Sequence, residues 1–68
     1  MEPSEIFELI IKADEKLKYA TPDKTDLRAG QARELLTQAR REAEAIGNAG
    51  LVEQADRRLA DLEALGGA

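Results

Sequence analysis

Hydrophobic residues recur along the first third of the chain at alternating steps of four and three, which places them in one stripe on a helix. The members of this stripe are Ile6, Ile10, Ala13, Leu17 and Ala20. Either Ser4, or Glu2 with Pro3 as the first helical residue, can cap the start. Pro22 restricts the residue before it to extended geometry and so closes the end. The pattern predicts a helix over about residues 3–20.

The same spacing returns twice more. The second stripe consists of Ala29, Ala32, Leu36, Ala39, Ala43 and Ile46, and the third of Val52, Ala55, Leu59 and Leu62 with Leu51 and Leu65 beside it. Thr25 or Asp26 can cap the second helix, and Gly47-Asn48 can end it and cap the third. Gly30 lies inside this second pattern and indicates a close backbone contact or a later helix start. These patterns predict helices over about residues 26–46 and 49–65.

Three helices joined by short turns predict an all-α fold of antiparallel neighbours, either a small bundle or a helix-turn-helix repeat, in a single domain over residues 1–68. No segment alternates polar and apolar residues for long enough to predict a strand. Most positions of the second stripe are alanine, and small side chains allow helix axes to approach closely. We therefore expect the second helix to lie in the middle, packed on both sides.

The amino-acid composition excludes several classes of function but says little about the fold. The chain has 68 residues with no Cys and no His, which excludes disulfides, zinc fingers, imidazole bases and thiol nucleophiles. Carboxylates are plentiful, but no pair has the spacing of a catalytic couple or of a metal site. We therefore expect no enzyme activity, no cofactor and no metal. A domain this small gains much of its stability from association when it lacks such supports.

Charge and hydropathy bear on the partner. The net charge is −4, which opposes phosphate backbones and disfavours nucleic acid. Its distribution leaves residues 21–47 neutral between two acidic flanks. No stretch approaches the roughly 20 apolar residues of a membrane span, and no secretory leader opens the chain. These features predict no membrane association and a cytoplasmic location.

The second and third segments resemble tetratricopeptide repeats, particularly bacterial ones. The resemblance rests on a small, large, small series at Ala32, Leu36 and Ala39, on the turn at Gly47-Asn48, and on a following helix that opens with a small residue. It covers about residues 29–62. It implies helix-hairpin packing and a protein-binding function.

Two groups of residues are candidates for partner binding. Phe7 and Ile11 add apolar surface to the first helix beyond the one face that a three-helix bundle buries. Either neighbouring helices cover both sides of this helix, or the two residues form an exposed patch that another chain covers, which is the interpretation we favour. The second helix carries arginines around a threonine, at Arg33, Thr37, Arg40 and Arg41. Guanidinium groups on one face predict a pocket for a carboxylate, for example in an acidic peptide. The alternative is a solvated face with Glu42 and Glu44 as internal partners.

The sequence therefore favours a non-catalytic helical interaction module that binds a protein partner or itself. Two alternatives stay open. One is a small nucleic-acid-associated regulator that reads its target with arginines of the second and third helices, namely Arg33, Arg40, Arg57 and Arg58. The other is an accessory domain of a multi-chain enzyme.

Overall fold

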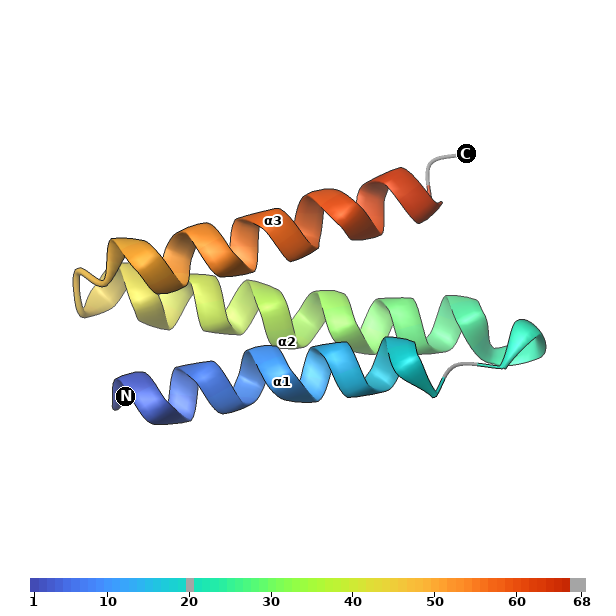
Figure 1. Cartoon of the computed structure of the whole chain (residues 1–68), viewed down its shortest axis with the longest axis horizontal. Helices are drawn as coiled ribbons and strands as arrows, with labels where there is room; N and C mark the ends of the chain where they lie inside the picture. The colour runs from blue at the N-terminus through green and yellow to red at the C-terminus, as the bar shows by residue number, and fades with distance from the viewer. Residues whose placement is uncertain (20, 67–68) are drawn as a thin grey trace.

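The computed structural model describes the backbone of residues 1–19 and 21–66 and the side chains of residues 1–19 and 21–64. It contains three α-helices and one short 3₁₀ turn: α1 (Pro3–Lys18), η1 (Pro22–Lys24), α2 (Thr25–Ala45) and α3 (Ala49–Gly66). The predicted all-α fold of three antiparallel helices is confirmed (Figure 1). Ala20 and the side chain of Leu65, both members of the predicted stripes, lie outside the described residues.

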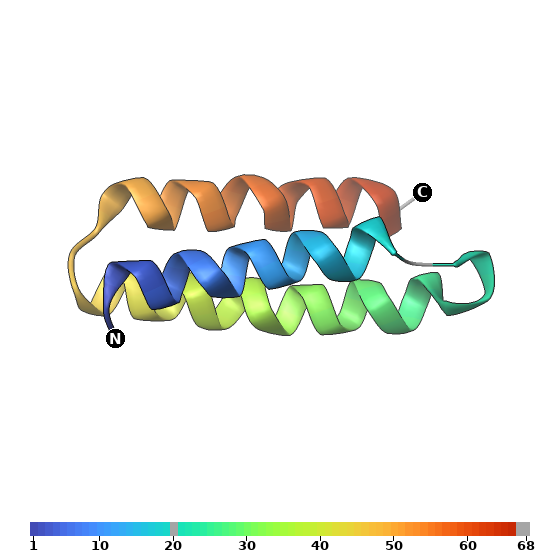
Figure 2. The same ribbon diagram turned by 60° about the horizontal axis from the view of Figure 1, so that its bottom comes forward.

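The second helix is the central element. α2 packs along both α1 and α3, whereas α1 and α3 touch each other over much less of their length. The two outer helices run in the same direction (Figures 1 and 2), and Figure 1 shows α3 diverging from α2 towards its C-terminal end. The Cα positions extend over 37 × 20 × 13 Å, so the molecule is elongated and thin. The expected middle position of the alanine-rich helix is therefore confirmed.

The core is built from the predicted stripes. Its buried residues are Ile6, Ile10, Ala13, Ala32, Leu36, Ala39, Ala43, Leu51, Ala55 and Leu62. All of them are apolar, and no polar or charged side chain is buried in the described part of the chain. Three of the four buried residues of α2 are alanines. Their small side chains let the neighbouring helices approach α2 from two sides.

Two starts were predicted for the first helix, and the structure shows the one with Glu2 as the capping residue and Pro3 at the first helical position. The backbone N–H of Glu2 donates to Glu5 Oε1 at 3.1 Å. Its end differs from the prediction, because the helix stops at Lys18 rather than near residue 20. Tyr19 leaves helical geometry with φ −101° and ψ 13° while its N–H still donates to the Glu15 carbonyl at 3.2 Å.

The predicted caps of α2 are wrong. Pro22 begins a 3₁₀ turn that leads directly into α2 at Thr25, so the chain is already helical at the residues that were expected to cap the helix. Neither Thr25 nor Asp26 serves as the capping residue, since that position belongs to Lys24, which makes no side-chain cap. The Thr25 hydroxyl instead donates to the Thr21 carbonyl at 3.0 Å.

Gly30 does not mark a close backbone approach. A Cβ built at this position would meet no atom within 4 Å. The helix also starts well before it, so neither of the predicted reasons for the glycine holds. Gly30 is an exposed helix-interior glycine that packs against nothing.

The turn between α2 and α3 forms as predicted. Gly47 has a φ of +70°, which glycine adopts without a steric penalty. The N–H of Asn48 donates to the Ala43 carbonyl at 2.9 Å and that of Gly47 to the Glu44 carbonyl at 3.1 Å, the two bonds of a Schellman motif. Asn48 then caps α3, because its Oδ1 accepts from the N–H of Leu51 at 3.1 Å.

Candidate functional site

The structure separates the six candidate residues into three places. Phe7 and Ile11 lie on α1. Arg33, Thr37 and Arg41 follow one another at steps of four along α2 and therefore share one of its faces. Arg40 also belongs to α2, but its side chain contacts α3. The candidates thus form two separate exposed surfaces and one internal contact.

The α1 surface is the apolar one. Phe7 is 43% exposed and Ile11 is 37% exposed, whereas Ile6 and Ile10 are fully buried. Each exposed residue directly follows a core residue in the sequence, so the core already occupies the adjacent face of the helix. We call the exposed pair, Phe7 and Ile11, the α1 patch.

The α2 surface is polar and mixed in charge. Its shallow hollow is lined by Arg33, Glu34, Thr37, Gln38, Arg41 and Glu42. Among the residues whose side chains are described, neither Arg33 nor Arg41 forms an ion pair. Glu34 and Glu42 line the same hollow and equal the two arginines in number, so the side chains that line it carry no net charge. The hollow is therefore not a cationic pocket.

Arg40 is exposed at the surface and pairs with carboxylates of the same chain. Its guanidinium pairs with Glu44 at 3.1 Å, one turn further along α2, and with Asp56 on α3. The Glu44 contact agrees with the alternative of internal partners. Because Arg40 and Arg33 are seven residues apart, they share a side of the helix, yet only Arg40 lies within reach of Asp56. Its charge is thus balanced by the chain's own carboxylates.

The arginines of α3 are likewise paired. Arg57 contacts Glu53 at 2.9 Å within its own helix. Arg58 crosses to α1, where its Nε donates to both oxygens of Asp14 at 3.0 and 3.1 Å. Of the four arginines in the nucleic-acid alternative, three therefore contact carboxylates of the same chain.

A groove between α1 and α2 was not foreseen from the sequence. It is lined by Lys12, Glu15, Lys16, Tyr19, Arg28 and Leu35. Arg28 donates to Gln31 Oε1 at 3.2 Å, and Tyr19 remains 69% exposed. The three cations come from two helices, and no spacing within one helix brings them together. The spacing of apolar residues could not predict this groove, because the groove forms only when α1 packs on α2.

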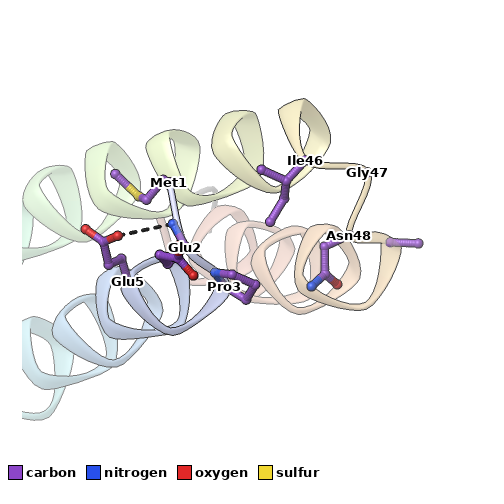
Figure 3. A pocket seen from close by; sticks show the side chains of 8 residues that line it. Met1, Glu2, Pro3, Glu5, Ile46, Gly47 and Asn48 are labelled. Atoms are coloured by element: carbon purple, nitrogen blue, oxygen red, sulfur yellow. Dashed lines mark hydrogen bonds between the residues drawn. The ribbon is translucent and has the colours of Figure 1, made fainter.

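A second hollow lies at the end of the bundle where α1 begins and the α2–α3 turn passes (Figure 3). Its polar groups are engaged in helix capping: Glu5 accepts from the Glu2 N–H, and Asn48 accepts from Leu51. Met1 and Ile46 add apolar surface and are 45% and 41% exposed. The hollow thus combines two capped helix ends with exposed apolar side chains.

Comparisons with protein-family models, with curated proteins and with solved structures give no match for this chain. Among the described residues, no helix is both long and apolar enough to cross a membrane. The assignment of a function therefore depends on the surfaces described above.

Proposed function

We propose that this protein is a non-catalytic helical interaction module, similar in packing to a tetratricopeptide repeat, that binds a partner protein or a second copy of itself. The α1 patch carries the proposal. Two large apolar side chains are left in water on a helix whose other face already fills the core. Exposed apolar groups of this kind mark interaction surfaces when they lie side by side.

The proposed binding role does not require a buried ionisable group. Within residues 1–19 and 21–64 the buried side chains are all apolar. The arginines that reach between helices, Arg40 and Arg58, each pair with a carboxylate of a neighbouring helix.

The α2–α3 hairpin supports the likeness to tetratricopeptide repeats. Buried alanines on α2 face a neighbouring helix on each side, and a Gly47-Asn48 turn connects the hairpin. The proposal includes a protein rather than a nucleic-acid or membrane partner, because the net charge is −4 and three of the arginines on α2 and α3 are neutralised locally. It also includes a cytoplasmic location, which fractionation of the source cells would test.

The test is capture of a partner from an extract of the source organism by the immobilised full chain. We expect Phe7→Ser to lose the partner, because it removes most of the exposed apolar area of the α1 patch. Leu27→Ser is the matched control, since Leu27 is 58% exposed at the start of α2, away from the patch. Circular dichroism of each variant checks that the helices are intact.

The outcomes separate clearly. Loss with Phe7→Ser and retention with Leu27→Ser support the proposal. If the wild-type chain retains no partner and also fails to self-associate, the interaction function is refuted. If Phe7→Ser retains the same partner at full occupancy, the α1 patch is not the binding surface, and Arg33→Glu with Arg41→Glu would then test the α2 surface.

A further inference from the structure

The groove between α1 and α2 is built from side chains of both helices, and we call it the α1–α2 groove. Lys12, Lys16 and Tyr19 follow one another at steps of four and three along α1 and its C-terminal end, so they share one side of that helix. Arg28 and Leu35 lie seven residues apart on α2 and form the other wall. Because the two helices are antiparallel (Figure 1), the end of α1 lies beside the start of α2.

Two cations of this groove are half-buried and have no carboxylate partner. Neither Lys16 nor Arg28 forms an ion pair with any described side chain. Arg28 donates to the neutral Gln31 side chain at 3.2 Å. The positions three and four residues from each cation hold no Asp or Glu, whereas Arg40, for comparison, has Glu44 at this spacing and pairs with it. The charges of Lys16 and Arg28 are therefore available to an external anion.

The groove is positive although the chain is acidic. Three cations and one carboxylate, Glu15, line it, which gives a local charge of +2 in a chain of net charge −4. Lys18 adds positive charge at one end, where its Nζ lies 5.5 Å from the centre of the Tyr19 ring. Glu34 lines an adjoining hollow together with Lys16 and offsets a part of this charge. A recess of one charge sign concentrates groups of the opposite sign from solution.

The groove also offers apolar and aromatic surface. Leu35 is half-buried in the α2 wall, and Tyr19 is 69% exposed at the end of α1. The groove has a volume of about 460 Å³, which lies within the range of ligand sites in proteins. An occupant therefore meets an apolar contact and several cations within one recess.

We propose that the α1–α2 groove binds an extended acidic segment of a partner protein, in which two carboxylates flank an apolar side chain. The apolar side chain packs on Leu35 and Tyr19, while the two carboxylates pair with Lys16 and Arg28. The planar guanidinium fork of Arg28 matches the two oxygens of a carboxylate. This inference rests on the proposed interaction function for the class of partner, but it uses neither residue of the α1 patch.

The carboxylates in and beside the groove favour a short acidic segment over a nucleic acid. Glu15 and Glu34 would repel a continuous line of phosphates. A peptide with separated carboxylates instead places negative charge only at Lys16 and Arg28. All the cations that line the groove precede residues 29–62, the range that resembles tetratricopeptide repeats, so the resemblance does not account for this site.

Tyrosine fluorescence of the full chain tests the proposal. The chain has one Tyr and no Trp, so its emission reports from the groove. The probe is a blocked peptide with a central leucine and a glutamate two residues to either side, which places all three side chains on one side of an extended chain. We expect saturable binding that weakens with added salt. Glutamines in place of the two glutamates should weaken binding at least about tenfold.

Substitutions that each remove one charge locate the site. Arg28→Gln and Lys16→Gln should both raise the dissociation constant of the glutamate peptide, by about tenfold for Arg28→Gln. Arg57→Gln is the matched control, because it removes the same charge from α3, which does not line the groove. It should leave the dissociation constant unchanged. Circular dichroism of each variant checks that the helices are intact.

Several results would overturn the proposal. One is the absence of binding at millimolar glutamate peptide, and another is equal affinity for the glutamate and glutamine peptides. A third is an equal loss of affinity in Arg28→Gln and Arg57→Gln, which would show attraction by overall charge alone. A single-stranded oligonucleotide that binds more tightly than the glutamate peptide would overturn the choice of a protein partner.

The groove and the α1 patch can be tested separately. Lys12 directly follows Ile11, and successive residues of a helix are rotated by about 100°, so the two surfaces lie on different sides of α1. No peptide binding, together with partner capture that Phe7→Ser abolishes, would refute the groove and leave the proposed function standing. Peptide binding that depends on Arg28, together with full partner capture by Phe7→Ser, would support the groove and overturn the α1 patch as the binding surface.

Discussion

Two glycines of α2 and its turn give a matched pair of substitutions with opposite expected signs. Gly30 is exposed in the interior of α2, and a Cβ at this position would meet nothing within 4 Å. Gly47 follows the same helix with a φ of +70°. Replacing each by alanine adds the same methyl group, so the difference between the two variants reports only the backbone conformation.

The magnitudes follow from helix propensity and from the left-handed region. Gly30→Ala should raise the free energy of unfolding by up to about 1 kcal/mol, because alanine loses less backbone entropy in a helix. Gly47→Ala places a Cβ in left-handed geometry, which costs about 1–2 kcal/mol, and a part of this is offset by restriction of the unfolded chain. The net expectation is a loss of roughly 1 kcal/mol.

Urea denaturation followed by circular dichroism measures both effects. In a domain of this size a change of about 1 kcal/mol moves the melting temperature by roughly 4–8 °C, so thermal unfolding gives a second reading. All variants must be compared at one protein concentration, because association would add to the apparent stability. If the two substitutions shift stability in the same direction, the reasoning from the two backbone conformations is refuted.

Three further experiments test the packing and the polar contacts. Ala39→Leu should destabilise the fold by about 1–3 kcal/mol through overpacking, while Ala45→Leu on the exposed side of α2 should change little in the same denaturation assay. Asn48→Ala removes the cap of α3 and should cost about 1 kcal/mol of unfolding free energy. A double-mutant cycle with Asp14→Ala and Arg58→Ala should give a coupling of about 0.2–1 kcal/mol that falls with added salt, because both side chains are partly exposed.

The helices could be predicted from the sequence because their signals are local. Apolar residues at three-four spacing select one helix face, and the buried residues of α2, such as Leu36 and Ala39, are those of the predicted stripe. Gly47 and Asn48 act through bonds to residues within five positions, so the turn was also readable. The end of α1 was harder to predict. Pro22 restricts only the residue before it, so the sequence does not determine whether the preceding residues continue the helix or join the loop.

Contacts between helices could not be predicted from the sequence in the same way. Asp14 has Lys18 four residues ahead, which favours a pair within α1, but the carboxylate contacts Arg58, 44 positions away. The pairing depends on how α1 and α3 lie against α2, which no local spacing encodes. The exposure of Phe7 was predicted from an excess of apolar residues, because counting can show that one face cannot bury them all.

Two inter-helix ion pairs contribute to fixing one arrangement of helices around the alanine-rich α2. Arg40 with Asp56 links α2 to α3, and Arg58 with Asp14 links α3 to α1. Partly exposed pairs add little net stability, yet each penalises a shift that would separate it. The second pair also sets where α3 lies against α1, on the side of α1 that carries both Asp14 and Phe7, and Phe7 nevertheless remains 43% exposed.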